Sequence, residues 1–495
     1  MKILLLICTF FVSSISIAQF VWHDLPNTPV APSAGSVAPE AGDVVLTDDG
    51  SIFASYIWDD GSGYKIYFEQ YTQANGWVSM YSETVYENLK MIKSRKIGND
   101  AYVLVKTGNS SSNPLFKVFK VNTGGVIEIT SFQLTDILDA AGFDFEMGAD
   151  ANFGYMLYKN GSGTGIKLSK IDYTTTTVSM SMPIISATNI DGFDMTIAGD
   201  SLFAVVSTAT PNGLLLLKSD LASAYLVPYI GSSATGELFN GGQPITTHNT
   251  MINSDGISKV FILGYDQGNI AGVEKMYEAG TITNFPYSGN LAEYYSPGAT
   301  VSTPQNIYYF NNYSPSNANP YTTYVSVRDV NTGVYDTLGS PTNYSLAVNS
   351  PKEHRIGFSL SDKRFAVSFY DAILQERFFR LSNNIPHLDQ NSLDQTPFLC
   401  EGHFGIIDEN IDVVTILNIF SSDVSIIDPA NAGFTLLADN TFSLFATADI
   451  PGLVTLSIEV TDGIDTIILT LPEITVTSSN PPVYNVAAID ICSGQ

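Results

Sequence analysis

The sequence predicts an all-β protein, and three observations support this fold class. Apolar runs of strand length recur along the 495 residues, joined by turns rich in Gly, Asp, Asn and Thr. Within many runs apolar and polar residues alternate around such turns, which is typical of β-hairpins. Related segments also return about every 50 residues, a period typical of propellers and solenoids. The chain is therefore expected to repeat one β-rich unit.

An acidic turn between two apolar runs marks each unit. Around Asp200 the sequence is MTIAGDSLFAVVS, and related turns contain Asp49, Asp100, Asp150, Asp255, Asn306 and Asp362. A second hairpin follows each of the first six turns, which gives four strands per unit. Four-stranded units arranged radially are the blades of a β-propeller. We therefore expect a seven-bladed β-propeller at residues 19–384.

The last unit is expected to be closed by the N-terminus. Its third strand, at 375–383, is followed by a Pro-containing linker at 385–397, so a fourth strand is missing. The segment QFVWHDL at 19–25 has no hairpin partner of its own. Because an open sheet edge promotes aggregation, we expect residues 20–25 to form the outer strand of the last blade.

A different type of domain is predicted after the linker. Strand-length runs separated by turns, without helical periodicity, indicate an immunoglobulin-like β-sandwich at 398–480. The segment PFLCEGHFGII at 397–407 is echoed by AIDICSGQ at 488–495. Residues 481–495 are therefore expected to begin a second immunoglobulin-like repeat.

The N-terminal segment and the net charge bear on location and partners. Residues 1–18 combine a Lys, an apolar run and small residues at the end, a pattern that predicts a secretory signal peptide. The mature protein is thus expected to be secreted, extracellular or at the cell surface. No later apolar run approaches the roughly 20 residues of a transmembrane segment. A net charge of −27 disfavours nucleic-acid partners.

The predicted ligand-binding loops join the second and third strands of the blades. Three of them begin with an aromatic residue followed by Asp, namely Trp58-Asp59, Tyr265-Asp266 and Tyr370-Asp371. Aromatic faces beside polar acceptors suit sugar rings or peptide segments, so we expect a glycan or protein ligand on this loop face. The alternative is that each aromatic residue ends a strand and packs between blades.

A second candidate site is formed by Asp144 and Asp194. They occupy matching places in GFDFEMGAD and GFDMTIAGD, at the entry of adjacent inner strands. Neighbouring carboxylates can act as acid and base or hold a cation. The alternative is that each Asp caps a strand or binds backbone amides.

No cofactor or metal site is predicted. HExxH, GxSxG and P-loop motifs are absent from the sequence. Calcium requires several oxygen ligands at one point, whereas the Asp turns are distributed one per unit. Because Asp bonds its own backbone in turns, a structural role is expected for them.

The signal segment ending at Ala18, the repeats rich in Asn and Thr, and Cys-Glu-Gly at 400–402 resemble large secreted surface proteins of Bacteroidota. Such proteins carry a sorting domain for type IX secretion, and some are associated with gliding motility. The resemblance implies a secretion or surface-assembly partner. Two tripeptides also resemble the O-glycosylation motif of that phylum, which would make Thr337 and Thr466 the modified residues.

Three functions remain open from the sequence. The first is a cell-surface binding or adhesion protein that displays a propeller on immunoglobulin-like modules. The second is a polysaccharide-acting hydrolase or lyase that uses carboxylates in the propeller funnel. The third is a structural component of a surface appendage or of a secretion or gliding assembly.

Overall fold

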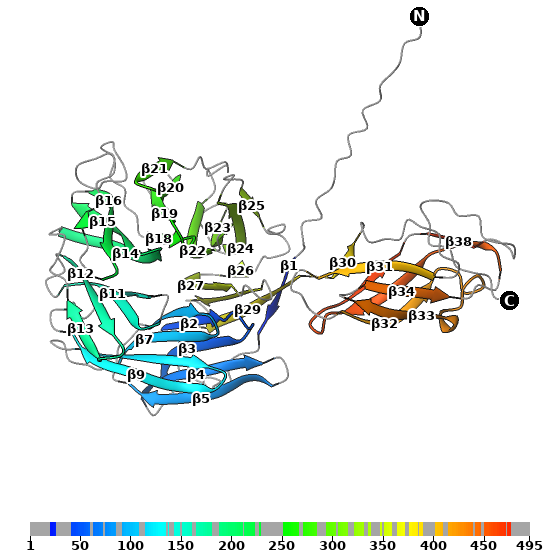
Figure 1. The fold of residues 1–495 in the computed structure, drawn as a ribbon, viewed down its shortest axis with the longest axis horizontal. Helices are drawn as coiled ribbons and strands as arrows, with labels where there is room; N and C mark the ends of the chain where they lie inside the picture. The colour runs from blue at the N-terminus through cyan, green and yellow to red at the C-terminus, as the bar shows by residue number, and fades with distance from the viewer. Residues whose placement is uncertain are drawn as a thin grey trace, which may run out of the picture.

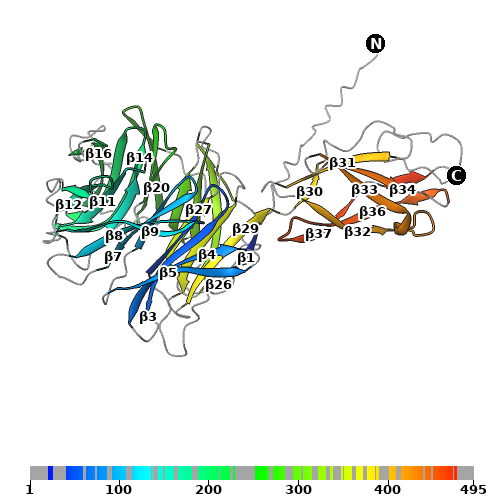
Figure 2. The ribbon, with the colours of Figure 1, turned by 60° about the horizontal axis from the view of Figure 1, so that its bottom comes forward.

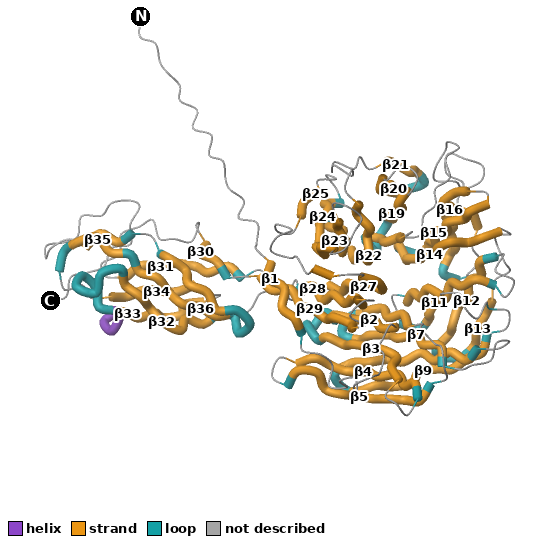
Figure 3. The backbone as a smooth tube through the Cα atoms, turned by 180° about the vertical axis from the view of Figure 1, so that it is seen from behind, coloured by secondary structure: helices purple, strands orange, loops and turns teal. Residues whose placement is uncertain are grey.

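The computed structural model describes residues 20–25, 41–59, 63–72, 75–85, 92–107, 114–134, 137, 143–148, 151–160, 165–180, 188–210, 212–222, 227–228, 251–266, 271–284, 294–302, 305–314, 321–330, 335–337, 347–348, 351–358, 364–371, 376–384, 386–389, 401–408, 414–438, 441–446, 450–471 and 473–476. Strands account for most of this part of the chain (Figure 3). The described residues form two lobes (Figure 1).

The larger lobe consists of antiparallel sheets, and in six of those described the main strands follow chain order. The first three are β2-β3-β4-β5 (Ala41–Leu46, Ile52–Asp59, Tyr64–Thr72, Gly76–Thr84), β6-β7-β8-β9 (Ile92–Ile97, Asp100–Lys106, Leu115–Asn122, Gly125–Gln133) and β10-β11-β12-β13 (Phe143–Met147, Phe153–Lys159, Ile166–Asp172, Thr177–Met180). Next come β14-β15-β16-β17 (Thr188–Ala198, Ser201–Thr210, Asn212–Asp220, Val227–Pro228) and β18-β19-β20-β21 (Met251–Ser254, Lys259–Asp266, Ala271–Glu278, Thr281–Asn284). The sheet β22-β23-β24-β25 (Tyr294–Ser302, Asn306–Ser314, Tyr321–Asp329, Tyr335–Thr337) has an additional strand, β26 (Ala347–Val348), paired with β24.

The first strands of these sheets surround the centre of the lobe (Figure 1). β2, β6, β10, β14, β18, β22 and β27 (Pro351–Phe358) contact one another in this order, and β27 contacts β2 again. Sheets that radiate from a closed cycle of inner strands make this lobe β-propeller-like.

The N-terminal strand belongs to the sheet at the end of this lobe. β1 (Phe20–Asp24) is the outer strand of β1-β29-β28-β27, with β28 at Phe365–Asp371 and β29 at Glu376–Asn384. The antiparallel register pairs Phe20 with Asn384 and Asp24 with Arg380. The Leu25 amide then donates to the Phe379 carbonyl at 2.9 Å. The pairing expected for the N-terminal segment is therefore present at Phe20–Asp24.

Apolar side chains fill the layers between neighbouring sheets. Between the first sheet and the last, Trp77 packs edge-on against Phe379, with ring centroids 5.1 Å apart. Between the third and fourth sheets, Leu157 and Leu168 pack with Met195 and Val206. Burial of such side chains stabilises the fold by about 25 cal/mol per Å² of apolar surface, so adjacent sheets hold one another in place.

The smaller lobe is built from the sheets β30-β31-β34-β33 (His387–Asp389, Glu401–Ile407, Thr441–Ala446, Ala432–Ala438), β32-β36-β37 (Thr415–Ser421, Leu456–Thr461, Thr466–Thr470) and β35-β38 (Gly452–Val454, Ile474–Val476). A short 3-10 helix, η1, covers Pro429–Asn431. The core of the smaller lobe includes Ile406, Phe442, Leu456, Ile458 and Val460. This core joins two of the sheets into one packed unit.

The predicted linker at 385–397 is wrong at residues 387–389. These residues form β30, whose register pairs His387 with Ile407 and Asp389 with Gly405. Leu388 packs against the core of the smaller lobe, so the segment gains apolar contacts that an exposed linker lacks. Residues 390–400 lie outside the described part of the chain. β29 of the larger lobe and β30 of the smaller lobe are thus separated by Ile385 and Pro386 only (Figure 2).

In the described ranges no helix has the length and apolar character required to cross a membrane.

Candidate functional site

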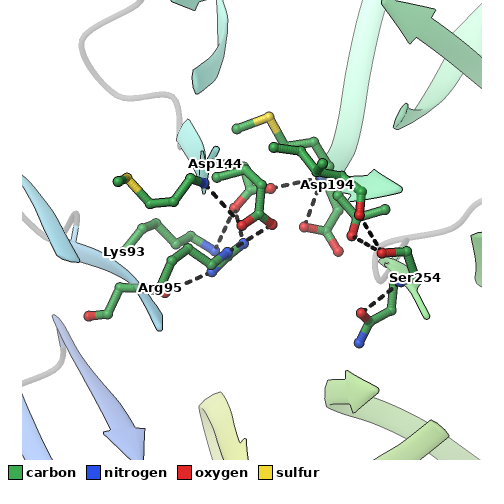
Figure 4. Close-up of polar contacts among 12 residues, drawn as sticks. Lys93, Arg95, Asp144, Asp194 and Ser254 are labelled. Carbon is green, nitrogen blue, oxygen red and sulfur yellow. Dashed lines mark hydrogen bonds and ion pairs between the residues drawn. The ribbon is translucent and has the colours of Figure 1, made fainter. Parts of the chain in front are cut away.

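A cluster of charged side chains lies on three neighbouring inner strands of the larger lobe (Figure 4). β6 contributes Lys93 and Arg95, β10 contributes Asp144 and Glu146, and β14 contributes Asp194. Because side chains two residues apart lie on the same face of a strand, each of the first two strands presents a pair. Lys93 and Arg95 point towards Asp144 in Figure 4.

Ion pairs connect β6 to β10. The Arg95 guanidinium donates from Nη2 to Asp144 Oδ1 at 3.1 Å and from Nε to Glu146 Oε2 at 3.1 Å. It also donates from Nη1 to the Ser94 carbonyl at 2.9 Å, so all three of its nitrogens are bonded. Lys93 Nζ lies 3.8 Å from Asp144 Oδ1, which is an ion-pair distance but too long for a hydrogen bond.

Carboxylates on the inner strands also bind backbone amides of the next sheet. Asp144 Oδ2 accepts from the Met195 amide at 2.8 Å, and Asp194 Oδ2 accepts from the Ile252 amide at 2.9 Å. Asp43 on β2 does the same with the Ser94 amide at 2.8 Å. The alternative interpretation of Asp144 and Asp194, that they bind backbone amides, therefore describes what their Oδ2 atoms do.

Lys93 occupies the place on β6 that a carboxylate has on the flanking strands. Ser94, whose amide binds Asp43, directly follows Lys93, just as Met195 follows Asp194. A lysine cannot accept a hydrogen bond from the next sheet. Ion pairs between side chains therefore connect β6 to β10. In the other pairs of neighbouring inner strands described above, an Asp side chain accepts a hydrogen bond from a backbone amide of the next strand.

The environment separates the pKa values of the two aspartates. Burial opposes ionisation of Asp144, which is 2% exposed, but Arg95 and then Lys93 outweigh burial and hold the pKa of Asp144 below its ordinary value. Burial, followed by the charge of Asp144, raises the pKa of Asp194 well above its ordinary value. Burial also raises the pKa of Glu146. The pKa values of Asp144 and Asp194 are thus shifted in opposite directions, so Asp144 gives up its proton more readily than Asp194 does.

The two aspartates have few oxygen atoms left to bind a substrate. A carboxylate beside a carboxylic acid is the combination used in acid–base catalysis. However, Asp144 already accepts from Arg95 and from Met195, and Asp194 already accepts from Ile252. In the described part of the chain no group of three or more His, Cys, Asp or Glu residues is placed to hold a metal ion.

The aromatic-Asp pairs occupy one equivalent place in three sheets. They end the second strands β3, β19 and β28, where Asp59 pairs with Tyr64, Asp266 with Ala271 and Asp371 with Glu376. Each pair therefore lies where the chain leaves the second strand for the loop to the third. The side chains of Asp59, Tyr265, Asp266, Tyr370 and Asp371 lie outside the described side chains.

Trp58 does not offer a ring face to a ligand. Its side chain is 3% exposed and packs against Tyr67, with ring centroids 6.0 Å apart. It belongs to the apolar layer that also contains Trp77 and Phe379. At this position the alternative interpretation, packing between neighbouring sheets, is correct, because an aromatic ring gains more from burial there than from exposure.

Two of the acidic turns, at Asp49 and Asp255, have the expected structural role. Asp255 Oδ1 accepts from the amides of Ile257, Ser258 and Lys259 at 2.8 to 2.9 Å. Asp49 Oδ1 accepts from the Ser51 amide at 3.1 Å and from the Thr47 hydroxyl at 2.6 Å. Both carboxylates thus stabilise their own turns.

The two glycosylation candidates lie in different surroundings. Thr466 is exposed on β37, and the carboxylate of Asp465 before it contacts His23 Nε2 at 2.9 Å. Thr337 ends β25, and its side chain lies outside the described side chains.

Sequence reasoning missed Lys93, Arg95 and Glu146 as members of the cluster. A signal was present, because the strand IKSRKI carries three cations in a chain with only 22 Lys and Arg residues. A cationic inner strand in one unit, followed by the acidic inner strand FDFEM in the next unit, indicates ion pairs between neighbouring sheets.

The similarities of the chain to known proteins are weak both in sequence and in structure. No protein-family model matches the chain, and no curated protein matches it. Similar solved structures include a hydrazine synthase from Kuenenia stuttgartiensis, with 12% identity, a TM-score of 0.42, and coverage of 70% of this chain and 96% of that chain. The β-propeller domain of the trilobed protease from Pyrococcus furiosus has 8% identity, a TM-score of 0.41, and coverage of 70% and 95%. The SapL1 lectin in complex with alpha methyl fucoside has 12% identity, a TM-score of 0.38, and coverage of 61% and 96%.

Proposed function

We propose that the protein is a secreted cell-surface binding or adhesion protein, in which a seven-bladed propeller is carried on an immunoglobulin-like lobe. The ligand is a glycan or a protein segment, bound on the face of the ring that contains the loops between second and third strands. Export by the type IX route, with glycosylation at Thr337 and Thr466, belongs to the same proposal. Its basis is the resemblance of the sequence to secreted surface proteins of Bacteroidota.

One observation supports the location of the ligand. The pairs at Tyr265-Asp266 and Tyr370-Asp371 end equivalent strands of two sheets, and in both the Asp pairs with the first residue of the third strand. Equivalent ends of equivalent strands lie at the same edge of the ring. The two aromatic-Asp pairs therefore stand at one face, as repeated contacts to an extended ligand require. Trp58, which is buried, is not part of this face.

Binding to a glycan array and a peptide array tests this proposal. The double variant Tyr265→Ala/Tyr370→Ala is expected to lose binding at least tenfold, because an aromatic platform contributes about 1–3 kcal/mol. The matched control is Tyr81→Ala, which removes an exposed aromatic residue from the outer strand β5. Equal binding by the double variant and the native protein would refute the proposed face.

A second candidate, a polysaccharide-acting hydrolase or lyase, is favoured by the pKa separation between Asp144 and Asp194. In this function Asp194 would donate a proton while Asp144 stays ionised. Turnover on a panel of polysaccharides, lost in Asp194→Asn, would support it. That substitution keeps an oxygen acceptor for the Ile252 amide and so removes the proton donor with little change in structure. No turnover by the native protein would eliminate this candidate.

A further inference from the structure

A polar network joins the two lobes at the strand that closes the ring. Asn383, which is fully buried on β29, donates from Nδ2 to Asp462 Oδ2 and to Asp465 Oδ2, each at 2.7 Å. His23 on β1 lies with Nε2 2.9 Å from the same Asp465 Oδ2. One carboxylate of the smaller lobe thus contacts the outermost strand of the last sheet and the strand beside it.

The turn that carries these carboxylates is shaped by the smaller lobe itself. Asp462 Oδ1 accepts from the amides of Ile464 and Asp465, both at 2.7 Å. The Thr461 hydroxyl donates to the Asp465 carbonyl at 2.7 Å, and Gly463 adopts φ 91, which favours glycine. Asp462 therefore divides its oxygens, one for its own turn and one for Asn383. Such a preformed turn binds at a lower entropic cost than a flexible one.

β1 is a short outer strand that no hairpin turn joins to its partner β29, so an additional contact can stabilise its position. It has five residues and pairs with β29 alone, with Leu25 providing one further backbone bond and a buried side chain. An outer strand this short opens easily by local unfolding. The Arg364 guanidinium donates to Asn383 Oδ1 at 3.1 Å, so the residue that receives the turn is itself held in place.

We infer that the smaller lobe acts as a clasp on the closure of the ring, through the turn Asp462–Asp465 bound to His23 and Asn383. The short connection between β29 and β30 brings this turn to the closing strand (Figure 2). A load applied to the smaller lobe then reaches β29 through the chain and β1 through Asp465. The two strands that close the ring, β1 and β29, therefore bear the load at the same time, so they do not separate one after the other.

Hydrogen–deuterium exchange of the full chain tests the clasp. Asp465→Ala and His23→Ala are expected to lower the protection of the peptide covering residues 20–25 roughly tenfold, the factor that corresponds to one net hydrogen bond. Protection of β18–β21 should not change. His23→Gln, which retains a donor, should restore most of the protection that His23→Ala loses.

The matched control is Asp423→Ala, because Asp423 also shapes a turn of the smaller lobe, where it accepts from the Ser425 amide at 2.9 Å. This control should leave residues 20–25 fully protected. The inference is overturned if residues 20–25 are as strongly protected from exchange in Asp465→Ala and His23→Ala as they are in the control. It is also overturned if the loss appears equally in every sheet of the ring. Neither result depends on the proposed ligand.

Discussion

Two buried carboxyl groups in the larger lobe have pKa values that are shifted in opposite directions. Asp144 on an inner strand is 2% exposed, yet its pKa is lowered, because Arg95 and Lys93 outweigh burial. Glu69 on β4 is fully buried, and burial raises its pKa to about 7 against the opposing effect of the Tyr56 hydroxyl. Burial is common to both groups, so the nearby cations decide in which direction the pKa moves.

The sheets explain this difference. Lys93 and Arg95 come from the strand next to β10, so Asp144 meets cations across a sheet-to-sheet step. Glu69 lies on the same face of β4 as Tyr67 and Tyr71, in a layer with Trp77 and Phe379. A charge in such an apolar layer is costly without a partner. The ionised form of a carboxyl group is therefore stabilised at the inner strands of the lobe and disfavoured in this apolar layer.

The largest expected effect comes from removing Asp144. Asp144→Ala should lower the free energy of unfolding by about 3 kcal/mol at pH 7, because Arg95 loses its buried partner and the Met195 amide loses its acceptor. Urea denaturation measures this. Asp144→Asn is the matched control, because it keeps an acceptor for Met195 and should lose less. The loss should shrink as the pH falls through the lowered pKa of Asp144. A change below about 1 kcal/mol at pH 7 would contradict the comparison.

Removing the charge of Glu69 should have the opposite sign. Below pH about 4.5 this group is protonated in both the folded and the unfolded chain, whereas between about 4.5 and 7 only the unfolded chain releases its proton. The native protein therefore loses up to about 3 kcal/mol of stability over this range. Glu69→Gln should remove that loss, so it should stabilise the protein more at pH 8 than at pH 4. Urea denaturation at both pH values tests this, and equal effects would show that Glu69 titrates normally.

The smallest effect is expected for Lys93. Its ammonium group is 3.8 Å from Asp144 Oδ1, and its side chain is 29% exposed, so solvent weakens the attraction. Lys93→Met should therefore cost less than about 1 kcal/mol at pH 7. If Lys93→Met lowered the free energy of unfolding as much as Asp144→Ala does, Lys93 would be the main cationic partner of Asp144 in place of Arg95. The same denaturation experiment distinguishes the two.

Local patterns were sufficient to predict most of the fold. Alternation and turn residues predicted the hairpins, and the absence of a fourth strand after residue 383 predicted a partner for the N-terminal segment, now seen in the pairing of β1 with β29. The strand β30 was missed because only three residues form it, and Pro386 directly precedes it. A three-residue strand is too short to show a period.

The site was harder to predict than the fold. Asp144 and Asp194 were identified because they repeat in sequence, but Lys93 and Arg95 meet them only through the order of sheets around the ring. Trp58 was misjudged because a strand-end aromatic residue has the same sequence pattern whether it is buried or exposed. Side-chain contacts between units depend on the three-dimensional arrangement, which local periodicity does not specify.

The closing strand also fixes the order in which the chain can fold. β1 is synthesised long before β29, with which it pairs, and its His23 contacts Asp465, which is 442 positions away in sequence. Contacts over such separations form slowly, because a long loop must be closed first. The sheets from β2 to β21 can each form from neighbouring segments, whereas β1 has to wait until β29 has been made. β1 is thus expected to take its place in the larger lobe after the sheets from β2 to β21 have formed.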